Sequence, residues 1–145
     1  MTPQDLQALT YVPCDPETER LFLSAAILAA PGERRSSITA SRPAWFYEPW
    51  HREVYDGLWR YRDYTGVDLV PVILTAEHRA KWPGWFDHFR SLFRDRAGES
   101  IGGFIRDWQR YASRLERIAA LRQKLFAAFE ALDQAVEECL SAERT

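Results

Sequence analysis

The stretch YASRLERIAALRQKLFAAFEALDQAVEE, residues 111–138, decides the fold class, because it lies in a long segment that can form one helix. Residues 104–145 contain neither proline nor glycine, whereas all eight prolines and all seven glycines lie before residue 104. Apolar residues recur there in steps of three and four, which is the heptad pattern of a helix with one apolar face, or seam. This seam, which is interrupted only by an arginine, contains Phe104, Trp108, Tyr111, Leu115, Ile118, Arg122, Leu125, Phe129, Leu132, Val136 and Cys139.

An unbroken helix over this segment would be about 60 Å long, since each residue adds about 1.5 Å. The small region before it can cover only part of such a seam, so we expect the remainder to pack against a second copy. The predicted oligomer interface consists of Trp108, Tyr111, Leu115, Ile118, Arg122, Leu125, Phe129, Leu132 and Val136. The predicted partner is therefore the protein itself, as a homodimer or a higher oligomer.

Charge is divided along the same helix. Residues 101–125 hold six basic and two acidic side chains, whereas residues 126–145 hold five acidic side chains and one basic. This order opposes the helix dipole, which favours acidic residues early and basic residues late. It suits antiparallel pairing, in which each basic half meets an acidic half. The alternative interpretation is that both halves are simply solvated faces.

The region before this helix is predicted to be a bundle of short helices. Asp15 is placed to cap a helix that has Pro16 at its first position and Glu17 in its first turn. A second helix is expected from Pro49 to Tyr64, with His51 and Leu58 on its apolar face. The chain is therefore predicted to be all-α, with a long C-terminal helix or helical hairpin. The expected division is an extension over 1–14, a bundle over 15–100 and an oligomerising helix over 101–145.

The segment VDLVPVILT, residues 67–75, looks locally like a strand, but Pro71 lies in its middle and no second strand is available to pair with it. A helix from about Pro71 to Trp82 fits the sequence better. The segment WFDHFRSLFRDR, residues 85–96, is a further amphipathic helix with its phenylalanines on one face.

Composition excludes several classes of protein. The net charge of −2 gives no overall attraction to nucleic acid. Two distant cysteines, Cys14 and Cys139, indicate reduced thiols and a cytoplasmic protein rather than a disulfide scaffold. The sequence contains no N-terminal signal pattern and no apolar run of the roughly 18 residues that a membrane helix needs.

No catalytic motif is present. The chain lacks a GxxxxGK[ST] phosphate loop and a Gly-x-Ser-x-Gly elbow, so we expect neither nucleotide hydrolysis nor a serine nucleophile. His51, His78 and His88 do not have the spacing of metal ligands, so no metal and no cofactor are expected. His51 lies on an apolar stripe and is interpreted as a core histidine with local hydrogen-bond partners.

Two stretches resemble the N-terminal domain of the DnaB-type bacterial replicative helicases. The segment PETERLFLSAAIL, residues 16–28, is similar to the family's Glu-x-Glu helix, although Ser24 stands where the family usually has glycine. The segment FYEPWHREVYDGLW, residues 46–59, is similar to its Phe-Tyr-x-x-x-His-Arg pattern. The segments TGVDLVPVIL and YASRLERIAALRQKL resemble two further family stretches. The matching motif residues are Glu17, Glu19, Leu23, Phe46, Tyr47, His51, Arg52 and Tyr55.

This resemblance implies an all-α domain that builds the collar of a hexameric helicase and docks primase or a helicase loader. In that family the ATP-hydrolysing motor lies further along the chain, so this chain would not be an enzyme, and the His51–Arg52 pair would be structural. The tail departs from the family, in which the helix breaks after about two dozen residues and a second helix returns to form a hairpin. No glycine or proline is available for such a break here.

Three functions therefore remain open. The first is an assembly and docking module of a replicative DNA helicase in DNA replication. The second is a free-standing plasmid- or phage-type adaptor or inhibitor that binds a helicase or primase, and the helicase-binding domain of primase is a related possibility. The third is nucleic-acid binding through possible phosphate contacts, which the acidic second half disfavours. These contacts would be made by Arg106, Arg110, Arg114 and Arg117.

Overall fold

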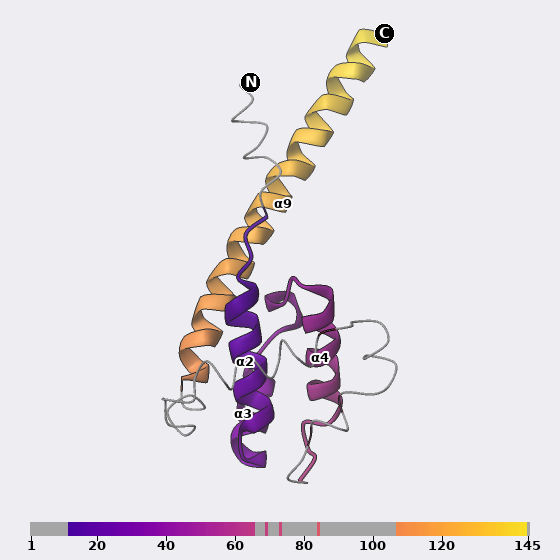
Figure 1. The fold of residues 1–145 in the computed structure, drawn as a ribbon. Coiled ribbons are helices and arrows are strands. Elements are labelled where there is room, and N and C mark those ends of the chain that lie inside the picture. The colour runs from indigo at the N-terminus through magenta and orange to yellow at the C-terminus, as the bar shows by residue number, and fades with distance from the viewer. Residues whose placement is uncertain (1–11, 66–68, 70–72, 74–83, 85–106, 145) are drawn as a thin grey trace.

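A computed structural model describes residues 12–65, 69, 73, 84 and 107–144, and all regular structure in these ranges is helical. Three α-helices and one 3-10 turn precede a helix much longer than any of them, and this long helix packs mainly on the first helix and the 3-10 turn (Figure 1). The predicted all-α class with a long C-terminal helix is confirmed. None of the described helices is both long enough and apolar enough to cross a membrane.

The first described helix, α2, spans Pro16–Leu28 and begins as its sequence predicts. Asp15 is the N-cap: its Oδ1 accepts a hydrogen bond from the Thr18 amide at 3.1 Å, and its Oδ2 accepts from the Thr18 hydroxyl at 2.7 Å. Pro16 and Glu17 occupy the first turn, where a missing amide and a negative charge cost least. The cap therefore fixes the position at which the bundle starts.

Helix α3, Pro31–Ala40, and the turn η1, Pro43–Trp45, were not predicted from the sequence, although each begins with a proline. Arg34 explains how α2 and α3 are joined without a glycine cap. Arg34 is 1% exposed, and its guanidinium donates to the carbonyls of Ala26, Ile27 and Ala29, which the end of α2 leaves unpaired. The Arg34 guanidinium also donates a fourth hydrogen bond, to the Tyr64 carbonyl at 3.3 Å. This bond joins the segment that contains Tyr64 to the end of α2.

Helix α4 spans Pro49–Arg60 and is shorter than the predicted Pro49–Tyr64. Tyr61 leaves the helical conformation, and its amide bonds the carbonyls of Gly57 and Trp59, which tightens the last turn and ends the helix. The expected apolar face is present, since His51, Val54, Tyr55 and Leu58 are all buried.

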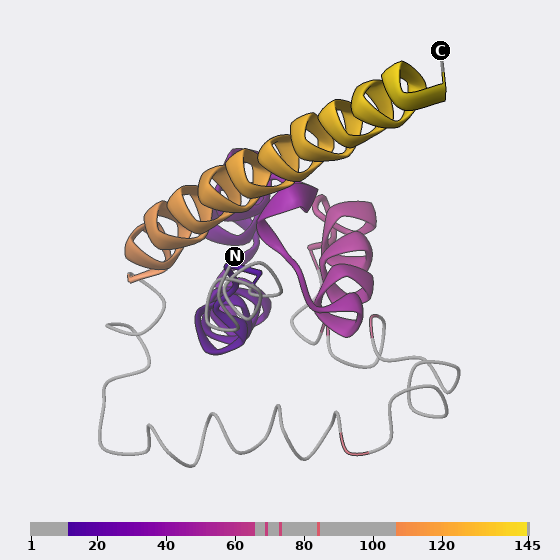
Figure 2. The same cartoon turned by 90° about the horizontal axis from the view of Figure 1, so that it is seen from above.

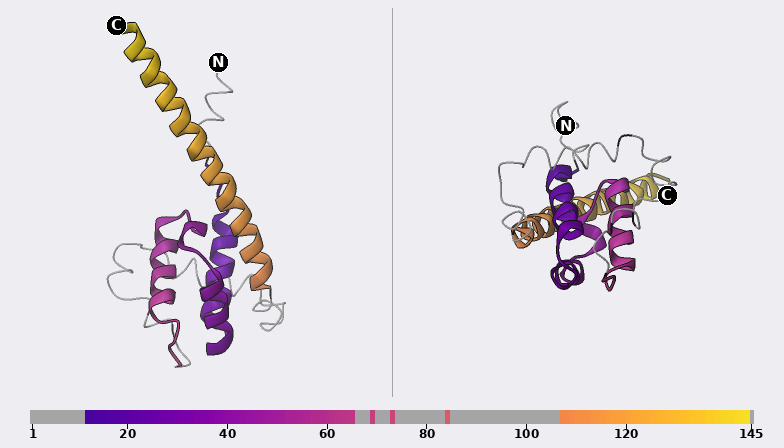
Figure 3. Two further views of the ribbon diagram at one scale, coloured as in Figure 1. Left: turned by 180° about the vertical axis from the view of Figure 1, so that it is seen from behind. Right: turned by 60° about the horizontal axis from the view of Figure 1, so that its bottom comes forward.

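Helix α9, Trp108–Arg144, is continuous over 37 residues, as the absence of glycine and proline predicts. Seen from above, it lies across the bundle as a single rod, and from behind its second half extends beyond the other helices (Figures 2 and 3). Its most extensive contacts are with α2. The other predicted helices, 71–82 and 85–96, lie almost wholly outside the described residues, as do His78 and His88.

The core is centred on Phe22 of α2, which is fully buried. The centre of its ring lies 6.1 Å from that of Trp45 in η1 and 5.8 Å from that of Phe46, the residue after η1. It lies 6.5 Å from the centre of the Trp108 ring in α9. Edge-to-face and tilted pairs of this kind stabilise beyond the area they bury. The aromatic cluster therefore joins the start of α9 to the N-terminal bundle.

Candidate interaction surfaces

Glu19 of α2 and His51 of α4 form a buried polar contact, which we call the Glu19 clamp. Glu19 is fully buried and His51 is 2% exposed. Oε1 of Glu19 lies 3.1 Å from His51 Nδ1 and also accepts hydrogen bonds from the backbone amides of Tyr47 and Glu48, at 3.1 and 3.3 Å. A proton on Nδ1 makes the imidazole a third donor to the same oxygen. The clamp joins two helices through one carboxylate atom.

The clamp is closed to solvent, which determines what His51 can do. Its Nε2 is buried with no hydrogen-bond partner in the described part of the chain, and the same is true of Glu19 Oε2. The indole of Trp50 stacks on the imidazole with a centroid distance of 4.9 Å. A general base must come within hydrogen-bond distance of the proton it removes. The sealed environment therefore suits a bracing role for His51.

The remaining motif residues surround the clamp. Nε of Arg52 donates to the Phe46 carbonyl at 2.7 Å, and the Phe46 ring stacks on Tyr55 at 4.7 Å. Burial raises the pKa of the Tyr55 phenol, whose oxygen receives a hydrogen bond from the Ser41 hydroxyl at 2.9 Å. Leu23 is 2% exposed. Glu17 is different, because its carboxylate faces solvent and lies 4.0 Å from Arg20.

Arg122 anchors α9 to the bundle. Although it interrupts the apolar seam, it is only 5% exposed. One guanidinium nitrogen donates to the Pro13 carbonyl at 2.8 Å and the other to the Ala44 carbonyl at 2.5 Å. The guanidinium carbon also lies 5.3 Å from the centre of the Tyr47 ring, a cation–π distance. The side chain thus ties α9 to the segment before α2 and to η1.

The predicted oligomer seam is divided between two environments. In the part of α9 before Arg122, Tyr111 and Leu115 are buried against the protein's own bundle, while Trp108 and Ile118 are partly buried. Beyond it, Leu125 and Phe129 are partly buried, and Leu132 and Val136 are 47% and 49% exposed. We define the distal stripe by its apolar side chains, which are Leu121, Leu125, Phe126, Phe129, Leu132, Val136 and Leu140.

Two of the four predicted phosphate-contacting arginines have carboxylate partners. Arg110 pairs with Asp107 at 3.2 Å, and Nε of Arg114 lies 2.5 Å from Oδ2 of Asp15. Burial alone would raise the pKa of the Asp15 carboxyl, but hydrogen bonds from Thr18 and Arg114 outweigh it and hold this pKa below its ordinary value. Arg117 is exposed, and Arg106 lies outside the described residues.

The other three arginines line a depression of about 450 Å³ between α2 and α9, which we call the arginine depression. It is lined by Thr18, Leu21, Arg110, Tyr111, Ser113, Arg114 and Arg117. Sequence reasoning had found the arginines but not the α2 side of the depression. That side depends on the crossing of two helices distant in sequence, and no local pattern reports it.

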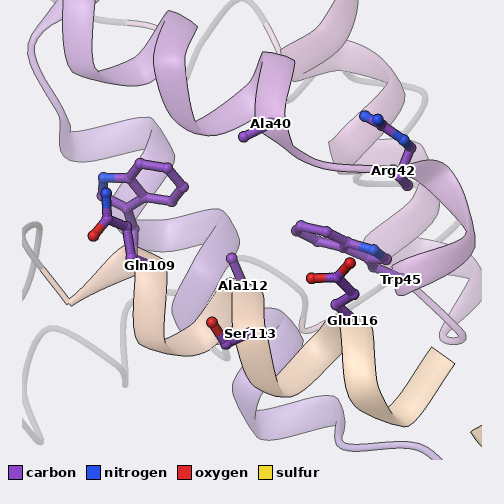
Figure 4. Close-up of a pocket in the computed structure, with 8 residues that line it drawn as sticks. Ala40, Arg42, Trp45, Gln109, Ala112, Ser113 and Glu116 are labelled. Carbon is purple, nitrogen blue, oxygen red and sulfur yellow. The ribbon is translucent and has the colours of Figure 1, made fainter. Parts of the chain in front are cut away.

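A second depression, of about 400 Å³, lies where α3 and η1 meet α9 (Figure 4). Ala40 faces Ala112 across it, and the Trp45 indole lies beside the Glu116 carboxylate (Figure 4). Arg42, Gln109, Ser113 and Trp108 complete its lining. Within the described ranges, no group of three or more His, Cys, Asp or Glu side chains could hold a metal ion.

Comparison of the chain with known protein families, with curated proteins and with solved structures found no match.

Proposed function

We propose that this protein is a non-catalytic assembly and docking module of a replicative DNA helicase, working in the cytoplasm during DNA replication. Its partners would be further copies of itself together with primase or a helicase loader. The proposal is carried by the Glu19 clamp. The two stretches that resemble the helicase collar are 32 residues apart at Glu19 and His51, yet these side chains meet at 3.1 Å in the core. Motif residues that contact one another fit a shared structural unit better than scattered coincidences would.

The distal stripe supports the docking part of the proposal. Five large apolar side chains between Leu121 and Leu140 are each at least 40% exposed along one helix. Isolated exposed apolar residues are ordinary, but a row of them on an unpacked helix is typical of a surface that binds another protein. Helix recognition commonly uses residues spaced by three and four in this manner.

The buried position of His51 supports a structural rather than a chemical role in this function. A sealed imidazole can hold α2 against α4 but has no route to a substrate. The nucleic-acid alternative is weaker, because the arginines at 110 and 114 are already paired with carboxylates. A partner that binds phosphates would first have to displace those acids.

The direct test mixes the purified protein with a bacterial DnaB-type helicase and, separately, with bacterial primase, followed by sedimentation velocity. We expect a complex with at least one of them. Leu132→Asp and Val136→Asp should weaken it at least tenfold, because each places an unpaired charge in the apolar contact. Gln134→Asp adds the same charge on the opposite side of the same exposed helix and is the matched control.

Circular dichroism of each variant establishes that α9 remains helical. Binding to neither protein contradicts the proposal, and so does a complex that all three variants leave unchanged. The free-standing adaptor or inhibitor alternative is separated by adding the chain to an intact helicase ring. An inhibitor slows unwinding, whereas a collar module leaves the rate of a complete ring unchanged.

A further inference from the structure

The arginine depression is a positively charged site formed where the first turn of α2 meets the basic half of α9. Arg110, Arg114 and Arg117 contribute three guanidiniums, and Thr18 and Ser113 contribute hydroxyls. Asp15 and Asp107 balance two of the three cations. No salt bridge to Arg117 is found among the residues that the structure describes. The site therefore retains positive charge and suits an acidic partner.

An acidic segment, opposite in charge to the arginine depression, lies at the other end of α9. Glu130, Asp133, Glu137 and Glu138 are exposed within a part of α9 that is exposed throughout from Glu130 onward. These carboxylates are separated from the basic half by only a few residues near Leu125. Because one straight helix carries both charges, a second copy can satisfy both ends only if it runs in the opposite direction.

The apolar side chains specify where two such helices would meet. With Leu125 at a two-fold axis, Ile118 lies opposite Leu132, and Leu121 lies opposite Phe129. These four positions continue one stripe at helical spacings of three and four. The same alignment brings Asp133 and Val136 of one copy to the level of Arg117 and Arg114 of the other. It also lets the second helix cover the distal stripe along its whole length.

We propose that the arginine depression receives the acidic end of α9 from a second copy, in an antiparallel pair whose two-fold axis passes near Leu125. This inference rests on the proposed function, since it assigns one partner to its docking helix. An isologous pair of this kind uses each surface twice, once in each protomer. Charge at both ends then fixes the direction of pairing, and the apolar stripe between them supplies the buried area.

Disulfide cross-linking tests the direction and the register together. In a Cys14→Ser, Cys139→Ser background, Leu125→Cys should cross-link to its own copy under mild oxidation. Ile118→Cys and Leu132→Cys should each fail alone and cross-link when the two proteins are mixed, because each lies opposite the other. Gln134→Cys, on the opposite side of the helix, is the control and should not cross-link.

Each other pattern overturns the proposal. A parallel pair would cross-link Ile118→Cys and Leu132→Cys each to itself. Another register would leave Leu125→Cys monomeric, and so would the absence of any pairing. If cross-linking appears only after deletion of residues 1–11, the chain's own N-terminal segment is the occupant instead. The experiment contains no helicase or primase, so its failure leaves the proposed function open to its own test.

Charge exchange tests the depression itself. Changing Glu130, Asp133, Glu137 and Glu138 to lysine should raise the dimer dissociation constant roughly tenfold or more at low salt, and less at high salt, because like charges then face each other. Adding Arg110→Glu and Arg117→Glu should restore the dimer, while Arg114 stays to hold Asp15. A combined variant that dimerises as weakly as the four-lysine variant would refute charge pairing. Oligonucleotide binding that is lost in Arg110→Glu and Arg117→Glu but is unaffected by dimerisation would assign the depression to phosphate instead.

Discussion

The two halves of α9 carry the same kind of apolar repeat but have different neighbours. Up to Arg122 the repeat packs on α2 and η1, and Leu115 is 1% exposed. Beyond Arg122 the same pattern is more open to solvent: Leu125 and Phe129 are only partly buried, and Leu132 is 47% exposed. A heptad pattern therefore identifies an apolar helix face but does not show which surface packs against that face. That depends on where the bundle ends.

Replacing one leucine by alanine in each half of α9 should give the largest difference in stability between the two halves. Leu115→Ala should lower the free energy of unfolding by about 2–5 kcal/mol, because it leaves a cavity in a packed core. Leu132→Ala should change the unfolding of dilute protein by less than about 0.5 kcal/mol, since its side chain is exposed. Urea unfolding followed by tryptophan fluorescence measures both. Equal losses would show that the distal half is covered within one protomer.

Arg122 marks the boundary between the halves, and its removal should be the next largest effect. Arg122→Met keeps much of the side-chain volume but leaves the Pro13 and Ala44 carbonyls without their donor. We expect a loss of about 1.5–3 kcal/mol, the range for hydrogen bonds to a charged group. Arg117→Met is the control and should be nearly neutral. If the two variants unfold alike, Arg122 is not the anchor that the contacts indicate.

The Glu19 clamp should stabilise the bundle on which the proximal half rests. His51→Ala should lower stability by about 1–3 kcal/mol, because it removes a buried partner of the Glu19 carboxylate. Thermal unfolding with a distal control, Gln134→Ala, isolates the effect. An unchanged melting temperature accompanied by loss of a measurable activity would instead indicate a chemical role for His51.

The smallest expected effect is the pH dependence of the contact between α2 and α9. The pKa of Asp15 is lowered in the folded protein, so its contribution is present above the unfolded value, about 3.9, and is lost as pH falls through the folded value. Asp15→Asn keeps the cap but loses the charge facing Arg114. Its melting temperature should be a few degrees below that of the native protein near pH 7, and the difference should vanish as pH falls through the lowered pKa of Asp15. A difference that persists in acid would exclude this ion pair as the cause.

Local signals in the sequence predicted the elements whose cause is local. The Asp15 cap, the proline at the start of α4 and the unbroken run after residue 104 each act within one or two helical turns. The antiparallel direction and the partner were also predicted from the sequence, and they stay predictions. Arg52 and Tyr55 were placed beside His51 by resemblance rather than by physical reasoning.

Sequence reasoning missed the features that depend on distant contacts. Arg34 looks like an ordinary surface arginine of α3, and only the meeting of α2, α3 and the Tyr64 carbonyl makes it a buried cap. Arg122 looked like a flaw in an apolar seam because nothing nearby in the sequence reports the Pro13 and Ala44 carbonyls. Both depressions have the same origin, since each is formed by helices that meet only in the folded chain.

The straightness of α9 also has a mechanical consequence. The 22 residues beyond Arg122 form a rigid arm about 33 Å long, because each residue adds about 1.5 Å. A tilt of about 10° at its base would therefore move its tip by about 6 Å, slightly more than the rise of one helical turn. A flexible apolar contact would tolerate that error, whereas the forked guanidinium of Arg122, fixed by two carbonyls from separate segments, resists rotation in two directions. The direction in which the arm points is thus set at Arg122, far from whatever surface its tip contacts.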